Sequence, residues 1–104
     1  MNKERAVNQI TVEEANIWRV SGELSFATVG ALLTEFTQRA ASSPPKVLDL
    51  CDVTRTDSAG LALLIEWLKQ TKEIPITFRN LPTQMLNLAD VSGVQDMLTH
   101  AVSE

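Results

Sequence analysis

Three aspartates lie close together in the middle of the chain, where acids could hold magnesium for phosphoryl transfer. They are Asp49, Asp52 and Asp57, and they accompany a short apolar segment that is typical of a buried strand. In a strand, alternation points Asp49 and its neighbours to different faces. No lysine follows at a position that would serve a phosphate. We therefore interpret the three residues as solvated loop acids and a helix cap, and we predict no metal site.

The other residue types that catalyse reactions are few and far apart. His100 is the only histidine and is far in sequence from any candidate nucleophile, which argues against a Ser-His-Asp triad. One cysteine and one histidine cannot form a structural zinc site. We expect Cys51, in its apolar segment, to be a small buried hydrophobic residue. Since the sequence also lacks a glycine-rich phosphate loop, we predict no catalytic residue, no cofactor and no enzymatic activity.

Asp57 and Ser58 stand where the apolar strand gives way to a long helical pattern. Both residue types cap helices, because their side-chain oxygens accept hydrogen bonds from the first unpaired N–H groups. Gly60 would let another backbone or a partner approach the first turn. Two interpretations of Ser58 remain open: it caps the helix and does nothing more, or it is a docking or phosphorylation point, since helix amino ends favour negative charge.

The helix that follows carries two apolar stripes when its residues are placed at about 100° intervals. The first stripe must face the sheet and consists of Leu61, Leu64, Ile65 and Leu68. The second stripe lies nearly opposite, beside Glu66 and Gln70, and consists of Ala59, Leu63 and Trp67. Either a neighbouring helix covers this second stripe, or it is exposed and marks a partner site with Trp67 as its anchor.

Periodicity and helix-breaking residues predict an α/β fold of the order β-β-α-β-α-β-α-(α). Strands are expected at 8–12, 17–20, 46–50 and 74–78, and helices at 25–41, from 58 onwards, from 82 to 93 and at 94–98. Strand–helix–strand connections of this length give parallel neighbours. We therefore expect a mixed, mostly parallel sheet of about four strands with helices packed against it. Residues 8–99 form the single domain, between tails at 1–7 and 100–104.

Composition restricts the class of partner. The 104 residues are 44% hydrophobic and 21% charged, as in an ordinary soluble domain, and carry a net charge of −4. This negative charge argues against binding to nucleic acid or directly to an anionic membrane. No apolar run approaches the roughly 20 residues that cross a bilayer, and the amino-terminal residues do not form a secretory signal. The expected location is the cytoplasm.

Three short motifs in this order resemble the STAS domain family, named after sulfate transporters and anti-sigma-factor antagonists. The motifs are Ser21-Gly22-Glu23-Leu24, Leu48-Asp49-Leu50 and Asp57-Ser58-Ala59-Gly60-Leu61, and the resemblance runs from about Gln9 to Leu98. It implies the same element order that the residue pattern predicts. One departure is Thr56, at a position that the family usually fills with Val or Ile.

Stand-alone STAS domains imply two main functions. Anti-sigma-factor antagonists bind a kinase-like anti-sigma factor and are inactivated by phosphorylation of the residue aligned with Ser58. The small STAS subunit of Mla-type ABC transporters, which maintain outer-membrane lipid asymmetry, instead docks on the cytoplasmic ATPase. The run Leu61-Ala62-Leu63-Leu64 resembles the transporter subunit, and antagonists more often have a second serine where this chain has Ala59. A nucleotide- or lipid-binding STAS module is a third, open alternative.

The resemblance therefore implies a non-catalytic subunit of a phospholipid-transport ABC system, peripheral to the inner membrane through its ATPase partner. The expected partner contacts are Ser58, Ala59, Leu63 and Trp67, with Glu66 and Gln70 at the polar rim. The alternative partner is an anti-sigma kinase, for which Ser58 is the expected phosphorylation site.

Overall fold

A computed structural model describes residues 9–14, 16–99 and 101 of the chain. The predicted amino-terminal tail and most of the predicted carboxyl-terminal tail lie outside these residues. Ala101 is described and is buried, and its carbonyl oxygen accepts a hydrogen bond from the Phe78 N–H.

Four strands form one mixed sheet in the order β1-β2-β3-β4. The strands are β1 (Gln9–Glu14), β2 (Ile17–Leu24), β3 (Val47–Thr56) and β4 (Thr77–Arg79). β1 is antiparallel to β2, whereas β2, β3 and β4 are parallel to one another. The predicted fold class and the predicted crossovers are confirmed.

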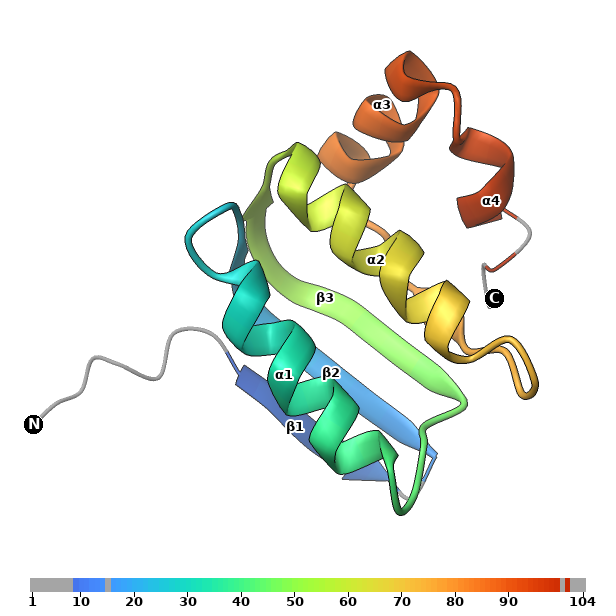
Figure 1. Cartoon of the computed structure of the whole chain (residues 1–104). Coiled ribbons are helices and arrows are strands. Elements are labelled where there is room, and N and C mark those ends of the chain that lie inside the picture. The colour runs from blue at the N-terminus through green and yellow to red at the C-terminus, as the bar shows by residue number, and fades with distance from the viewer. Residues whose placement is uncertain (1–8, 15, 100, 102–104) are drawn as a thin grey trace, which may run out of the picture.

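Four helices complete the chain: α1 (Val29–Ala40), α2 (Ser58–Gln70), α3 (Thr83–Ser92) and α4 (Gln95–Thr99). Figure 1 shows α1 and α2 side by side on one face of the sheet, with α3 on the other side of α2 from α1. Gly93 ends α3 in the left-handed conformation, at φ 77°, and its N–H returns to the carbonyls of Ala89 and Asp90. This termination of the helix by glycine was expected from the sequence.

The sheet differs from the sequence prediction mainly in the length of two strands. β2 passes through Gly22, at φ 97°, and continues to Leu24, and β3 continues to Thr56 beyond the predicted end at Leu50. The parallel β2–β3 ladder extends both strands, with two register shifts at which β3 contains an extra residue. Such bulges let a polar sequence remain in a ladder that local propensity alone would end.

The largest buried side chains join α1 and α2 to each other and to the sheet. Trp67 of α2 stacks on Phe36 of α1, with ring centroids 4.8 Å apart, and Phe36 meets Trp18 of β2 edge-on at 5.6 Å. Trp67 and Phe36 are both 0% exposed, and Leu63 is 4% exposed. Of the two alternatives for the second stripe of α2, coverage by a neighbouring helix is therefore confirmed for Leu63 and Trp67.

Candidate protein-binding site

The junction between β3 and α2 is organised by the Asp57 carboxylate. Its Oδ1 accepts hydrogen bonds from the N–H groups of Ala59, at 2.8 Å, and Gly60, at 3.4 Å, so Asp57 is the N-cap of α2. Its Oδ2 accepts one from the Phe26 N–H at 3.2 Å, and its own N–H donates to the Leu24 carbonyl at 3.0 Å. One side chain thus holds the helix start and the loop after β2 together.

Electrostatics keep the Asp57 carboxylate charged in this position. Burial on its own raises the pKa, but the backbone N–H groups of Phe26, Ala59 and Gly60, together with the charge of Arg55, lower the pKa of Asp57 below its ordinary value. A negative charge at the amino end of a helix is also favoured by the helix dipole.

Ser58 is the first residue of α2 and is exposed. The prediction that Ser58 shares the capping role with Asp57 is wrong, because the Asp57 carboxylate already accepts from the N–H groups that a cap satisfies. The serine side chain is therefore at the surface, directly beside the capped end of the helix.

The first turn of α2 packs tightly against the end of β3. Thr56 is buried, and its hydroxyl donates to the Asp57 carbonyl at 3.1 Å while its N–H donates to the Gln84 side chain at 3.0 Å. This pairing of the hydroxyl lets a threonine be buried at the end of β3. A Cβ on Gly60 would overlap Thr56 Oγ1 and would lie 2.8 Å from the Leu24 carbonyl oxygen. The absence of a side chain at Gly60 therefore lets the ends of β2 and β3 pack closely against the first turn of α2.

Gly60→Ala is expected to destabilise the domain by about 1–3 kcal/mol, because the added methyl group must displace backbone atoms. Gly30→Ala is the matched control: a Cβ at Gly30 meets nothing within 4 Å, so the same change in α1 should stabilise by about 0.5–1 kcal/mol. Urea unfolding of the two variants measures both effects. Equal stability of the two variants would contradict the close packing at Gly60.

An apolar groove lies between the amino-terminal halves of α1 and α2, beside the junction. It has a volume of about 370 Å³ and is lined by Phe26, Val29, Gly30, Leu33, Ala59, Ala62, Leu63 and Glu66. Phe26, at one end of it, is 87% exposed. Apart from Glu66, every lining residue is apolar. An exposed concave surface of this composition is typical of a site where another molecule is bound.

The structure divides the six predicted contact residues into three groups. Ala59 and Glu66 are half-buried and line the groove, and Ser58 is exposed next to it. Gln70 is exposed near the other end of α2, where its Oε1 accepts a hydrogen bond from the Thr37 hydroxyl at 3.2 Å.

Leu63 and Trp67 form the third group, and their prediction as partner contacts requires correction. Trp67 has no exposed surface, and only 4% of Leu63 is exposed, at the floor of the groove. The reason is that α1 packs on this side of α2, so the stripe is used within the domain. Neither side chain can be the exposed anchor that the sequence suggested.

Sequence reasoning missed the residues that give the groove its other wall. Phe26, Val29, Gly30 and Leu33 come from α1 and the turn before it, and Ala62 comes from α2. The available signal was Phe26, a large apolar residue one turn ahead of the periodic face formed by positions 29, 32, 33 and 36. A groove between two helices has no signature within either helix alone.

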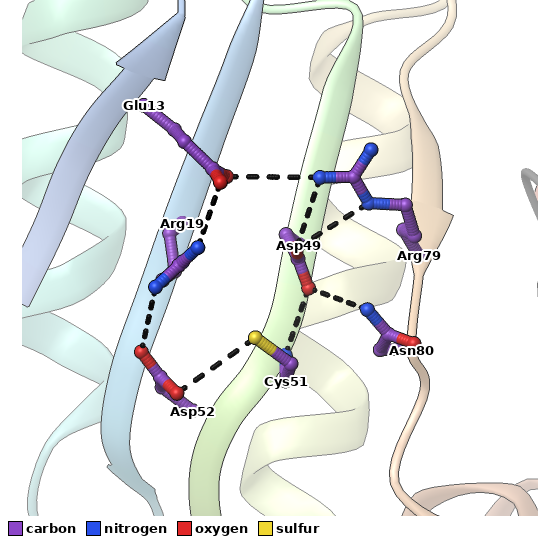
Figure 2. Close-up of polar contacts among 7 residues, drawn as sticks. All are labelled: Glu13, Arg19, Asp49, Cys51, Asp52, Arg79 and Asn80. Atoms are coloured by element: carbon purple, nitrogen blue, oxygen red, sulfur yellow. Dashed lines mark hydrogen bonds and ion pairs between the residues drawn. The ribbon is translucent and has the colours of Figure 1, made fainter.

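The opposite face of the sheet carries a ring of polar contacts that crosses all four strands, as Figure 2 shows. In order around the ring the members are Glu13, Arg79, Asp49, Cys51, Asp52 and Arg19. Arg19 lies 2.7 Å from Glu13 and 3.2 Å from Asp52, and Arg79 lies 3.0 Å from Asp49. The two acids of β3 in this ring, Asp49 and Asp52, are therefore paired within the domain.

Cys51 belongs to this ring and is exposed, so its prediction as a buried hydrophobic residue is wrong. Strand alternation places Leu48 and Leu50 under the helices and Asp49 and Cys51 on the other face. Slight desolvation of its sulfur and the nearby Asp49 and Asp52 raise the pKa of the Cys51 thiol. A raised pKa keeps the sulfur in its less reactive protonated form.

Asp49 is the most deeply placed acid of the ring, with 5% of its side chain exposed. Burial alone would raise its pKa, but hydrogen bonds from Asn80, the Cys51 N–H and Arg79 outweigh it and lower the pKa of Asp49 from 3.8 to about 2. Within residues 9–14, 16–99 and 101, no group of three or more His, Cys, Asp or Glu residues is arranged to hold a metal ion.

The lowered pKa of Asp49 predicts a loss of stability in acid. Its folded-state pKa lies below the unfolded value, so the stabilisation is present above about pH 4 and disappears as the pH falls through about 2, by about 2 kcal/mol in total. Urea midpoints measured from pH 5 to 2 test this. Asp49→Asn should flatten the profile, whereas Asp90→Asn, at an exposed position of α3, should not. Parallel profiles for wild type and Asp49→Asn would contradict it.

Comparison with known proteins agrees with this geometry. The chain belongs to the STAS domain family, because the family model described as "Mlab, STAS domain" matches residues 9–99. A curated relative is the "intermembrane phospholipid transport system binding protein MlaB" of Haemophilus influenzae. It is 33% identical over 90 residues, which cover 78% of this chain and 83% of that protein.

Two solved structures share the fold. The anti-sigma factor antagonist SpoIIAA in its unphosphorylated form has a TM-score of 0.64 at 14% identity, covering 86% of this chain and 83% of that one. SLC26A9 has a TM-score of 0.51 at 20% identity and covers 84% of this chain, which corresponds to 17% of its own length. In the part of the chain that the structure describes, no helix is long and apolar enough to cross a membrane.

Proposed function

We propose that this protein is the non-catalytic STAS subunit of an ABC transporter for phospholipids, and that it binds and supports the cytoplasmic ATPase. The likeness to the intermembrane phospholipid transport protein MlaB, over 83% of that protein's length, carries the proposal. The subunit would lie at the cytoplasmic side of the inner membrane through its partner and would contribute to outer-membrane lipid asymmetry.

The apolar groove beside Ser58 supports this proposal physically. A lasting subunit interface needs apolar surface that water leaves on binding, and small residues such as Ala59 and Ala62 let a partner come close. Ser58, Ala59 and Glu66 are the proposed contacts at the groove. Gln70 lies about 18 Å from Ser58 along α2, within reach of the same partner.

The alternative is an anti-sigma factor antagonist that is regulated by phosphorylation of Ser58. The specific observation in its favour is the exposed Ser58 at the amino end of α2, where a phosphate would meet a favourable dipole. The likeness to SpoIIAA, at 14% identity, concerns the fold alone. The apolar lining of the groove favours the transporter subunit.

Co-expression of the tagged full chain with the phospholipid-transport ATPase of the same organism tests the proposal. A stable complex of the two chains, with the intact mass of this chain unchanged, is the expected result. A parallel incubation with an anti-sigma kinase and ATP tests the alternative. Absence of ATPase binding together with the mass gain of one phosphate at Ser58 would reverse the assignment.

A further inference from the structure

The groove between α1 and α2 is open because small residues line it on both helices. On the α1 side, a Cβ at Gly30 would meet nothing within 4 Å. On the α2 side, the lining residues Ala59 and Ala62 have only methyl side chains. Small residues on two neighbouring helices form a channel in which a third helix can seat its side chains.

Phe26 is fixed in an exposed position at the end of this groove. Its N–H donates to Asp57 Oδ2 at 3.2 Å, and the turn that follows is closed by Thr28, whose hydroxyl donates to the Glu23 carbonyl at 2.7 Å. The Ser25 N–H in turn donates to Thr28 Oγ1 at 2.9 Å. The backbone on both sides of Phe26 is thus anchored while 87% of the residue faces solvent. A partner that covers this ring gains a large apolar contact, and little entropy is lost because the backbone around Phe26 is already ordered.

Among the residues that the structure describes, Glu66 is the only charged one that lines the groove. It is half-buried, and no hydrogen bond or ion pair joins its side chain to another described residue. Two other acids of α1 and α2 are engaged: Asp57 caps α2, and Glu35 in the middle of α1 pairs with Arg39 at 3.1 Å. A carboxylate beside an apolar surface favours a cation on the molecule that covers it.

From this arrangement we propose that the partner binds through an amphipathic helix. One apolar face of that helix fills the groove against Phe26 and Gly30, and a lysine or arginine on its edge pairs with Glu66. This inference rests on the proposed function, since the helix belongs to the ATPase. It adds the chemistry of the segment that docks and the residues that recognise it.

Gly30→Leu tests the groove without disturbing the core. The new side chain enters open space and replaces a poor helix former by a good one, so the domain should unfold at an equal or higher urea concentration. Binding to the ATPase should weaken by about tenfold or more, because leucine occupies the volume of the docked side chain. The control is Ala31→Leu, the same residue at the next, exposed position of α1 outside the groove, with binding within about twofold of wild type.

Glu66→Lys tests the ion pair. Charge reversal should weaken ATPase binding by about tenfold or more, and Glu66→Gln should weaken it less while reducing its dependence on salt. Asp90→Lys makes the same change of charge on α3 and should bind like wild type. Wild-type affinity of both Gly30→Leu and Glu66→Lys would overturn the inference and leave the proposed function standing. Failure of the wild-type chain to bind the ATPase would overturn both.

Discussion

Trp67→Ala is expected to lower the free energy of unfolding by about 3–5 kcal/mol, the usual cost of removing a large buried aromatic ring. Trp67 has no exposed surface and stacks on Phe36 with ring centroids 4.8 Å apart, so its removal separates α2 from α1. A domain of this size has about 5–15 kcal/mol of stability in total, so the variant should lose a large share of it. Urea unfolding followed by far-ultraviolet circular dichroism measures the loss.

Two further variants show that the effect comes from burial. Phe26→Ala removes an aromatic ring that is 87% exposed and should change the stability by no more than about 0.5 kcal/mol. Trp67→Phe should cost less than Trp67→Ala, because it keeps a ring for Phe36 and removes an indole N–H that is buried without a partner among the described residues. Wild-type stability of Trp67→Ala would contradict the packing of α1 on α2. Loss of binding in a charged Trp67 variant would reflect unfolding and says nothing about the interface.

Ala62→Arg is expected to weaken ATPase binding by about 100-fold, equivalent to about 2.7 kcal/mol, while leaving stability unchanged within about 0.5 kcal/mol. Ala62 is exposed on α2 and lines the groove one helical turn before Glu66, so an arginine there occupies the apolar interface and competes with the partner's cation for the Glu66 carboxylate. Calorimetric titration of the purified ATPase with each variant gives the affinity.

Val91→Arg is the control for Ala62→Arg. Val91 is 87% exposed on α3, which lies on the other side of α2 from the groove, so the same bulky charge should leave binding intact (Figure 1). Equal binding by the two arginine variants would place the interface away from the groove. A loss of affinity in Val91→Arg alone would move the interface to α3.

The sequence determined most elements and several of their ends through local physics. The helical spacing of Leu61, Leu64, Ile65 and Leu68 predicts one face of α2, and the structure has that helix. Asp57 was predicted as a cap and is the cap, because a short carboxylate before an apolar helix has N–H groups within reach. Gly93 ends α3 for an equally local reason.

The ends of the strands were less predictable because pairing partners decide them. β3 was expected to stop at Leu50, but it continues to Thr56 along β2 with two bulges. Asp52 is unfavourable in a strand on local propensity, and only the ladder with a distant strand overrides it. Alternation of side chains along β3 places Cys51 on the face of the sheet that carries the ring of polar contacts.

The functional surface depended on the tertiary structure. Periodicity shows that Ala59, Leu63 and Trp67 share a side of α2, but it does not show what lies against that side. Packing of α1 buries Trp67 and almost all of Leu63, and leaves Ala59 at a groove that is completed by Phe26 and Gly30 from elsewhere in the chain. A sequence pattern specifies which residues of one element share a face, whereas the packing of the other elements decides which part of that face remains available to a partner.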